Sequence, residues 1–447
     1  MSFSRYPSYK ESGIPEVGPL PSHWKIQPLK KVVSFNDEEL EEATPEDFEI
    51  LYVDISSVDG VRGITKKDSM PFSQAPSRAR RRVRHGDIIV STVRTYLRAI
   101  ARIIHPEPNL VVSTGFAVVR PRDLVTPSYL GYLLSSNYFL EEVVARSTGV
   151  SYPAINASDL VRILAIMPPI VEQEIIASFL DQETAKIDAL ITEQQRLIEL
   201  LKEKRQAVIS HAVTKGLNPD VRMKPSGVEW LGEVPEHWEV TRLKNLLSES
   251  LKYGANESAE LDDPTQPRFV RITDIDEDGN LKDESFRSLP RYVAQPYLLR
   301  EGDVLLARSG ATVGKSFRYS NRWGEACFAG YLIRARLETQ LCLPDWLNYF
   351  CQTNAYWGYV VGSQIQATIQ NVSAEKYGNL YLPVPSIGEQ RAIIEALDDR
   401  LARLKNLIDD AANSITLLQE RRTALISAAV TGKIDVRNYA STQQDAA

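Results

Sequence analysis

The chain contains an internal repeat, and this repeat constrains its fold more than any other feature. Residues 12–33 (SGIPEVGPLPSHWKIQPLKKVV) match residues 226–247 (SGVEWLGEVPEHWEVTRLKNLL), and the later stretch 168–173 (PPIVEQ) matches 385–390 (PSIGEQ). The offset between the two copies grows only from 214 to 217 residues along the chain. Because so few insertions separate the copies, we expect the two halves to fold in the same way.

Each half divides into a strand-rich part and a long helix. Short runs of β-branched and aromatic residues, bounded by glycine and proline, predict strands at 88–93, 116–120, 303–308 and 331–336. Prolines at 168–169 and 385, each followed by an acidic first turn, predict the start of a helix. This order, found twice, indicates the α+β class.

Both predicted helices carry a heptad pattern over four heptads, which is typical of a coiled coil. An arginine recurs in the two seams, and we expect this residue (Arg205 and Arg422) to set the register and to pair with Glu203 or Glu420. The alternative is that each helix packs along its own globular domain. The predicted apolar seam consists of Ile187, Ile191, Ile198, Leu201 and Val208 in the first helix, and of Leu401, Leu404, Ile408, Ile415, Leu418 and Leu425 in the second.

These patterns predict two α/β domains related by a pseudo-twofold axis. A long helix follows each domain, and the two helices pair as an antiparallel coiled coil. The predicted parts are a first domain at 1–168, a first helical region at 169–215, a second domain at 216–384, a second helical region at 385–435 and a flexible tail at 436–447.

The composition is that of an ordinary globular protein, with 447 residues, 43% hydrophobic and 25% charged. The three cysteines form no C-x-x-C pair, so we expect reduced thiols and no structural zinc site. No apolar run approaches the roughly 20 residues that span a bilayer. We therefore expect a cytoplasmic protein that makes no contact with a membrane.

The charge is unevenly distributed. The net charge is −6, but residues 62–102 hold eleven Lys and Arg against two acids, and residues 308–336 hold six against one. Acidic residues gather instead at 37–49. One basic zone in each half favours a polyanionic partner, and the alternative is that these zones are ordinary solvated faces.

Two stretches resemble known enzyme motifs but lack residues that those motifs require. The stretch 309–316 (SGATVGKS) is one residue too short for a phosphate-binding loop, and 167–170 (MPPI) lacks the polar and aromatic residues of an amino-methyltransferase motif. The five histidines have no metal-ligand spacing, and His23 and His237 each precede a tryptophan, which indicates a packed corner. We expect no catalytic residue, no metal site and no bound cofactor in this chain.

The sequence resembles the specificity subunits of type I restriction–modification systems. The resemblance rests on GPLPSHWKIQPLK and GEVPEHWEVTRLK, on GDIIVSTVR and GDVLLARSGATVGK, and on PPIVEQ and PSIGEQ, and it covers nearly the whole chain. It implies that 1–168 and 216–384 are target recognition domains, each reading one half of a bipartite, asymmetric site on double-stranded DNA. It also implies a non-catalytic subunit that holds two methyltransferase subunits, which use S-adenosylmethionine, and up to two restriction subunits, which use ATP and Mg. The target sequence and its spacer length stay open.

The resemblance and the basic zones together suggest which residues touch DNA. Arginine suits phosphate oxygens and guanine, and polar side chains on loops can reach base edges. The first half has TYLRAIAR where the second has ATVGKSFR, so the first domain lacks the Gly-Lys element of the second. The competing hypothesis is a coiled-coil adaptor that binds proteins and no DNA. The base-reading candidates are Ser91, Thr92, Arg94, Thr95, Tyr96, Ser147, Thr148, Tyr152, Arg308, Ser309, Thr312, Lys315, Gln364, Gln366 and Thr368. The phosphate candidates are Arg78, Arg80, Arg81, Arg82, Arg84, Arg98 and Arg318.

Overall fold

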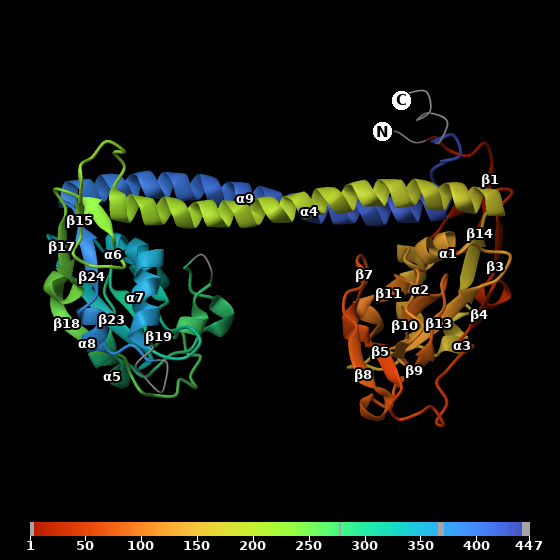
Figure 1. Cartoon of the computed structure of the whole chain (residues 1–447), viewed down its shortest axis with the longest axis horizontal. Coiled ribbons are helices and arrows are strands. Elements are labelled where there is room, and N and C mark those ends of the chain that lie inside the picture. The colour runs from red at the N-terminus through yellow and green to blue at the C-terminus, as the bar shows by residue number, and fades with distance from the viewer. Residues whose placement is uncertain (1–3, 277–278, 365–370, 440–447) are drawn as a thin grey trace. The chain divides into compact units, whose positions relative to one another are not determined.

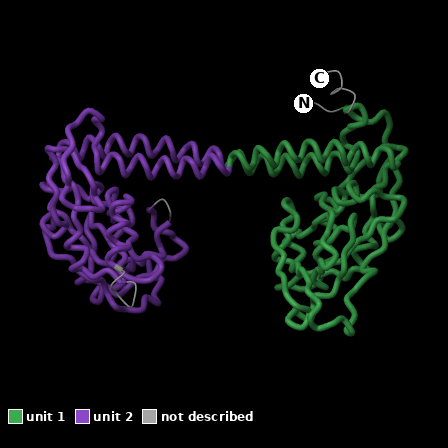
Figure 2. The backbone as a smooth tube through the Cα atoms, in the orientation of Figure 1, with its two compact units in different colours: residues 1–194, 413–447 green, residues 195–412 purple. Residues whose placement is uncertain are grey.

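The computed structural model describes residues 4–276, 279–364 and 371–439, and the chain forms two compact units (Figure 2). Unit 1 comprises residues 1–194 and 413–447, and unit 2 comprises residues 195–412. Two long helices, α4 (Ile170–Lys215) and α9 (Ile387–Val430), begin within two residues of the predicted starts. Each unit contains half of each helix, so the helical regions are not compact units of their own.

Unit 1 contains a four-stranded antiparallel sheet in the order β11-β10-β13-β4 and a mixed sheet in the order β8-β5-β12-β9 (Figure 1). Three two-stranded pairs, β1-β2, β3-β14 and β6-β7, complete the strands. The strands are β1 (Tyr9–Glu11), β2 (Pro19–Pro21), β3 (Lys25–Pro28), β4 (Val33–Phe35), β5 (Glu49–Val53), β6 (Val58–Asp59), β7 (Gly63–Ile64), β8 (Asp68–Pro71), β9 (Ala79–Arg82), β10 (Ile88–Ser91), β11 (Ile100–Arg102), β12 (Leu110–Ser113), β13 (Phe116–Pro121) and β14 (Leu164–Met167). The short helices are α1 (Pro127–Leu134), α2 (Asn137–Arg146) and α3 (Ala157–Leu160).

Unit 2 repeats this topology. Its four-stranded sheet has the order β18-β23-β20-β21, and β15-β16, β17-β24 and the parallel pair β19-β22 correspond to β1-β2, β3-β14 and the parallel pair β5-β12. The described strands are β15 (Met223–Pro225), β16 (Glu233–Pro235), β17 (Glu239–Arg242), β18 (Leu247–Tyr253), β19 (Arg268–Val270), β20 (Val304–Ala307), β21 (Ser316–Arg318), β22 (Ala326–Phe328), β23 (Leu332–Leu337) and β24 (Tyr381–Val384). The short helices are α5 (Arg291–Ala294), α6 (Pro344–Phe350), α7 (Asn354–Gln364) and α8 (Ala374–Gly378). The predicted repeat of the fold is therefore confirmed.

The Gly-Asp turns before β10 and β20 fix the central sheet of each unit. The Asp87 and Asp303 side chains are each 1% exposed, and each accepts two hydrogen bonds at 2.8 Å from an arginine on the adjacent strand, Arg120 or Arg336. A buried carboxylate is tolerated only when it is paired in this way. Arg336 lies in the second basic zone of the sequence, but its charge neutralises the buried Asp303 within the fold.

The repeated Glu-Gln motif joins each long helix to its unit. Glu172 accepts hydrogen bonds from Trp24 Nε1 at 2.8 Å and pairs with His23 Nε2 at 2.6 Å. Glu389 makes the same contacts with Trp238 at 3.0 Å and with His237 at 2.9 Å. The interpretation of the His-Trp dipeptides as packed corners is confirmed.

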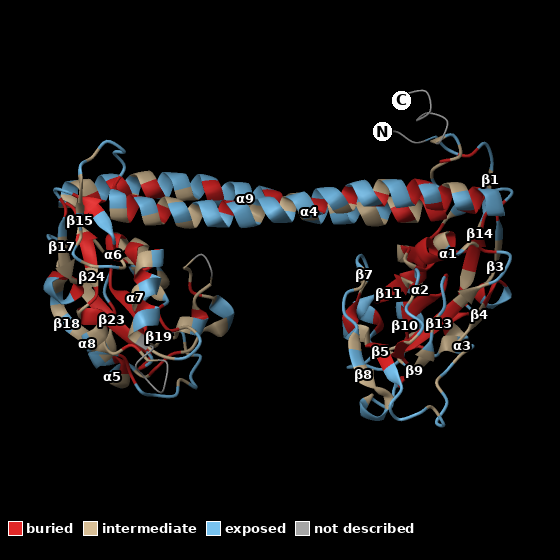
Figure 3. Cartoon of the chain, in the orientation of Figure 1, coloured by how far each residue is buried: buried red, intermediate tan, exposed pale blue. Residues whose placement is uncertain are grey.

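The two long helices pair antiparallel within each unit. In unit 1, Arg422 Nε of α9 lies 3.0 Å from Asp188 Oδ1 of α4. In unit 2, Leu401 and Ile408 of α9 line the same cleft as Arg205 of α4. All predicted seam residues are buried or half-buried, while most residues between them are exposed (Figure 3). The predicted partner of Arg422 was wrong, because Asp188 takes the place of the expected glutamate.

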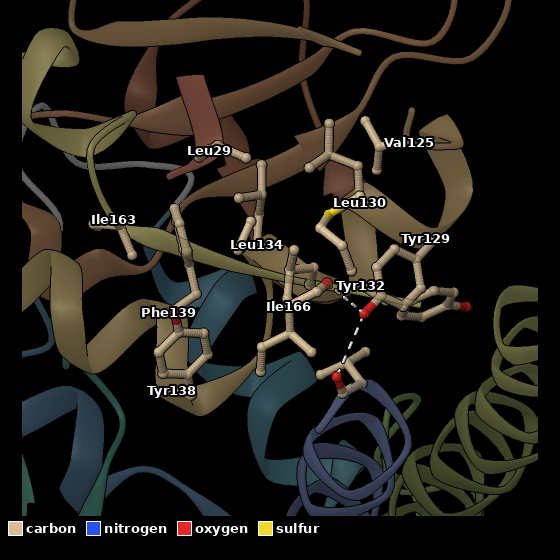
Figure 4. Close-up of a cluster of buried hydrophobic side chains, with 14 of the residues drawn as sticks. Leu29, Val125, Tyr129, Leu130, Tyr132, Leu134, Tyr138, Phe139, Ile163 and Ile166 are labelled. Carbon is tan, nitrogen blue, oxygen red and sulfur yellow. Dashed lines mark hydrogen bonds between the residues drawn. The ribbon is translucent and has the colours of Figure 1, made fainter. Parts of the chain in front are cut away.

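The end of α9 closes the apolar core of unit 1. Tyr129 Oη donates a hydrogen bond to the Ile166 carbonyl at 2.9 Å and lies 3.4 Å from the Val430 carbonyl, amid the packed side chains of α1, α2 and β14 (Figure 4). The chain after α9 also packs on this unit, because Val436 is buried and the Tyr439 ring lies 4.6 Å from that of Phe179. The predicted flexible tail therefore begins too early at residue 436. Within the described residues, no helix is long and apolar enough to cross a membrane.

Candidate nucleic-acid interface

The two predicted reading loops of unit 1 come together. Val93, after β10, forms a β-bridge with Ala154, and Ala154 in turn pairs with Thr148 of the loop that follows α2. The Thr92 carbonyl accepts a hydrogen bond from Ile155 N at 2.9 Å. Backbone pairing thus fixes residues 91–98 beside residues 147–155.

Three of the base-reading candidates in this unit are buried. Ser91 Oγ donates to the Val93 carbonyl at 2.6 Å, Thr92 Oγ1 donates to the Gly115 carbonyl at 2.9 Å, and Thr95 Oγ1 lies 2.9 Å from Ser147 Oγ. Their hydroxyl groups bind protein atoms, so in this conformation they hold the loops together and do not face solvent. Sequence patterns could not separate these residues from exposed ones of similar type.

The exposed side chains of these loops are larger. Arg94 adopts a left-handed backbone conformation (φ 51°), and its guanidinium lies 5.1 Å from the ring centroid of Tyr152. Tyr96 is 56% and Tyr152 65% exposed, and Thr148 is also exposed. An arginine with two tyrosines offers hydrogen-bond donors and flat apolar surface, both of which suit the edges and faces of bases.

Unit 2 brings its corresponding loops together in the same frame. The Arg308 amide donates to the Tyr331 carbonyl at 2.9 Å, the Arg308 carbonyl accepts from Val372 N at 2.8 Å, and Ser309 forms a β-bridge with Asn371. Thr312 is half-buried and Lys315 is exposed. The remaining candidates are Gln364, which ends α7, and Gln366 and Thr368, which lie outside the described residues.

The Gly-Lys element of unit 2 has a packing explanation. Gly314 has φ +88°, and a Cβ at this position would lie 2.8 Å from Trp357 Cζ3, so that a side chain does not fit. The residues that follow form strand β21, whereas a phosphate-binding loop leads into a helix. The rejection of a nucleotide-binding loop is consistent with this geometry.

The densest basic patch is partly neutralised by the acidic segment that precedes it. Arg81 pairs with Glu39 at 2.5 Å, Arg84 with Glu38 at 2.7 Å, and Arg78 with Asp54 at 2.8 Å. Burial raises the pKa of the Glu38 carboxyl, but hydrogen bonds and positive charge from Arg120 and Arg84 outweigh it and hold the pKa below its ordinary value. Glu38 and Glu39 of the acidic run therefore lie beside this patch in the fold.

The other arginines predicted to contact phosphate differ in how far their side chains are already engaged by protein groups. Arg80 lies over the Phe72 ring at 4.7 Å, and Arg318 pairs with Asp345 at 2.8 Å and with Glu301 at 3.2 Å. Arg82 and Arg98 are exposed, and no ion pair involves either of them within the part of the chain that the structure describes. These two are the phosphate candidates whose charge is least compensated by the protein.

The described residues contain no group of three or more His, Cys, Asp or Glu side chains arranged to hold a metal ion. All three cysteines are buried, and burial raises the pKa of the Cys327 and Cys342 thiols to about 12 and that of Cys351 well above its ordinary value. Protonated, buried thiols are poor nucleophiles.

Sequence analysis missed the aromatic neighbours of Arg308. The guanidinium of Arg308 lies 4.7 Å from the ring centroid of Tyr253, which ends β18, and Tyr331 beside it is 71% exposed. The only available signal was the presence of tyrosines near the ends of predicted strands. The contact of Tyr253 with Arg308 depends on pairing between segments about 55 residues apart, which propensities do not report.

Comparison with known proteins agrees with this picture. Residues 79–201 match the family model described as the type I restriction modification DNA specificity domain. The EcoBI type I restriction enzyme specificity subunit of Escherichia coli is 23% identical over 305 residues, which cover 66% of this chain and 64% of that subunit. This chain is therefore similar to type I restriction enzyme specificity subunits.

Two solved structures share the fold of this chain. One, described as the structural basis of complex assembly and conformational transition of the type I R-M system, aligns with a TM-score of 0.72 and 22% identity over 92% of this chain and 98% of that one. The HsdS subunit from Thermoanaerobacter tengcongensis aligns with a TM-score of 0.52 and 23% identity over 93% of this chain and 98% of that one. The α+β fold with two long helices is confirmed.

Proposed function

We propose that this chain is the DNA-reading subunit of a bacterial or archaeal type I restriction–modification complex in the cytoplasm. Each unit reads one half of a bipartite, asymmetric site, and the chain itself catalyses no reaction. Two methyltransferase subunits supply S-adenosylmethionine chemistry, and up to two restriction subunits supply ATP- and Mg-dependent cleavage.

One observation carries this proposal. In each unit, two segments that are distant in sequence pair in the same backbone frame. Beside this pairing an arginine lies over a tyrosine ring, Arg94 over Tyr152 of the second loop in unit 1 and Arg308 over Tyr253 at the end of β18 in unit 2. The frame is repeated, but the side chains differ. Two domains that read different half-sites need a shared scaffold with different reading residues.

A binding experiment separates this function from the adaptor alternative. The purified chain is mixed with random-sequence DNA duplexes over a range of salt concentrations. A DNA reader loses affinity linearly with log[salt] because counterions return to the phosphates. A weak response that does not change with salt would favour the protein adaptor.

A methylation assay tests the absence of catalysis. The chain, duplex DNA and S-adenosylmethionine are incubated with and without type I methyltransferase subunits. We expect adenine methylation only when those subunits are present. Methylated DNA from this chain alone would contradict the proposal.

A further inference from the structure

Arg308 is held more firmly than an arginine that simply projects into solvent. Its backbone is fixed on both sides by the Tyr331 carbonyl and by Val372 N. One face of its guanidinium lies 4.7 Å from the Tyr253 ring centroid, and its Nε lies 3.5 Å from Asn371 Oδ1. The loop and the side chain are thus both oriented before any ligand binds.

Tyr253 is itself fixed. It pairs with Ile333 in the register of β18 and β23, and its hydroxyl oxygen accepts a hydrogen bond from Ala374 N at 3.0 Å, at the start of α8. The ring is therefore tied at the backbone and at its tip. A tyrosine that is 41% exposed and tied at both ends provides a rigid platform for a cation.

The charges around Arg308 differ from those around the structural arginines nearby. Arg334 and Arg336 on β23 each lie 2.7 Å from a carboxylate oxygen of Glu249. No carboxylate pairs with Arg308 among residues 4–276, 279–364 and 371–439. Its positive charge is left for a ligand, while those of its neighbours are used in the fold.

The free part of Arg308 defines the ligand. With one face on Tyr253 and Nε directed at Asn371, the two terminal nitrogens Nη1 and Nη2 remain as a planar pair of donors. A planar pair of donors matches the O6 and N7 acceptors of guanine in the major groove. Adenine offers a donor at the position of O6, and cytosine and thymine lack the pair of acceptors.

We propose that Tyr253 is a positioning residue that presents Arg308 to one guanine of the half-site read by unit 2, an inference that rests on the proposed function. Asn371 assists by fixing the Nε edge. The reading is of a base and not of the DNA backbone, because a guanidinium fixed on two sides can select one acceptor pattern. A flexible arginine suffices for a phosphate.

The experiment selects duplexes from a random-sequence DNA library with the intact chain and its modification subunits. The wild-type protein should select a bipartite site, and Arg308→Ala should identify one guanine by losing its preference there. Tyr253→Ala should weaken the preference for that same guanine by about 2- to 30-fold, the range expected for a lost cation–π contact. Tyr253→Phe keeps the ring and should retain most of the preference.

Two matched controls isolate the effect. Tyr292→Ala removes another exposed tyrosine of unit 2, 83% exposed on α5, and should leave the selected site unchanged. Tyr152→Ala should affect only the other half-site. Thermal melting of each variant reports whether it folds, and the Phe variant tests the proposal even where the Ala variant is unstable.

The outcomes are distinguishable. If the wild-type protein selects no DNA sequence, the proposed function fails and this inference fails with it. If the wild-type protein selects a site but Tyr253→Ala keeps the full guanine preference, only the role of Tyr253 is overturned. A loss of affinity that is equal for all sequences would assign Arg308 to a phosphate and would also overturn the inference.

Discussion

At the scale of single residues, buried side chains at the helix starts join the helices to the strands. Gln173 is 1% exposed and accepts from Thr126 N at 2.9 Å while donating to the Leu124 and Pro168 carbonyls at 3.2 and 2.9 Å. Gln390 makes the equivalent three bonds in unit 2. One amide thus satisfies three backbone groups that are far from water, so its loss leaves all three unpaired.

We therefore expect Gln173→Ala to lower the free energy of unfolding of unit 1 by about 2–4 kcal/mol. The matched control is Gln182→Ala on the same helix, where the side chain is exposed and the effect should stay within about 0.5 kcal/mol. Urea denaturation followed by circular dichroism measures both. Equal losses of unfolding free energy in the two variants would show that the hydrogen bonds of the buried Gln173 amide do not stabilise the unit.

A pH dependence follows from Glu249. A hydrogen bond from Arg336, with the charges of Arg336 and Arg334, outweighs the opposing effect of burial and lowers the pKa of this carboxyl to about 2. A carboxyl whose pKa falls on folding stabilises the fold above its unfolded value of 4.5, and this stabilisation disappears as the pH falls toward 2. Glu249→Gln should therefore be less stable than wild type at pH 7, and the difference in urea midpoint should shrink below pH 4.5.

The arginines of β9 differ in their surroundings, and the proposed function then predicts different salt effects. Arg82→Ala should reduce the slope of log affinity against log[salt] by about 0.9, the value for one lost phosphate contact. Arg81→Ala should leave the slope unchanged, because Arg81 is paired with Glu39 and its side chain is 15% exposed. Titrations of random-sequence duplex at several salt concentrations compare the two variants. A larger change in slope for Arg81→Ala than for Arg82→Ala would contradict the assignment of Arg82 to a phosphate.

At the scale of elements, the seam of the long helices accounts for their pairing. Ile191 in the seam of α4 is 9% exposed, whereas its neighbour Leu190 is 52% exposed. Two adjacent apolar residues therefore have opposite environments, as a heptad pattern requires.

Truncation of these two residues should have unequal costs. Ile191→Ala should lower the free energy of unfolding by about 2–4 kcal/mol, because it opens a cavity between α4 and α9. Leu190→Ala should cost less than about 1 kcal/mol. Thermal melting followed by far-ultraviolet circular dichroism compares the two variants. A larger loss of stability for Leu190→Ala than for Ile191→Ala would mean that the seam is misassigned.

At the scale of the whole molecule, α4 and α9 each contribute to both units. If each unit reads one half-site, helix length should set the spacer between half-sites. Four residues inserted into each helix, after 194 and after 412, add about 6 Å of rise, equal to one or two base pairs. Methylome sequencing should show unchanged half-sites with a spacer longer by that amount, allowing for local unwinding at the inserted stutter. An active variant with an unchanged spacer would contradict this role of the helices.

The sequence by itself determined the repeat, the helix starts and the coiled-coil seam. These features depend on local or periodic patterns, such as the acidic first turn at Glu172 and the heptad spacing around Ile191, and local patterns can be read without knowing distant contacts. The sequence also predicted two base-reading loops in each unit from their matching positions in the repeat, and in unit 1 the two loops lie side by side.

Only the tertiary structure decided which side chains in those loops are available. Ser91, Thr92 and Thr95 are polar and were expected to face DNA, yet all three are buried, and the hydroxyl groups of Thr92 and Thr95 are bound by partners from other segments. The acidic run at 37–49 neutralises arginines about 40 residues away, and Tyr253 meets Arg308 across a sheet. The charge of a segment and the exposure of a hydroxyl depend on what lies beside them in space, and strand pairing between distant segments sets those neighbours.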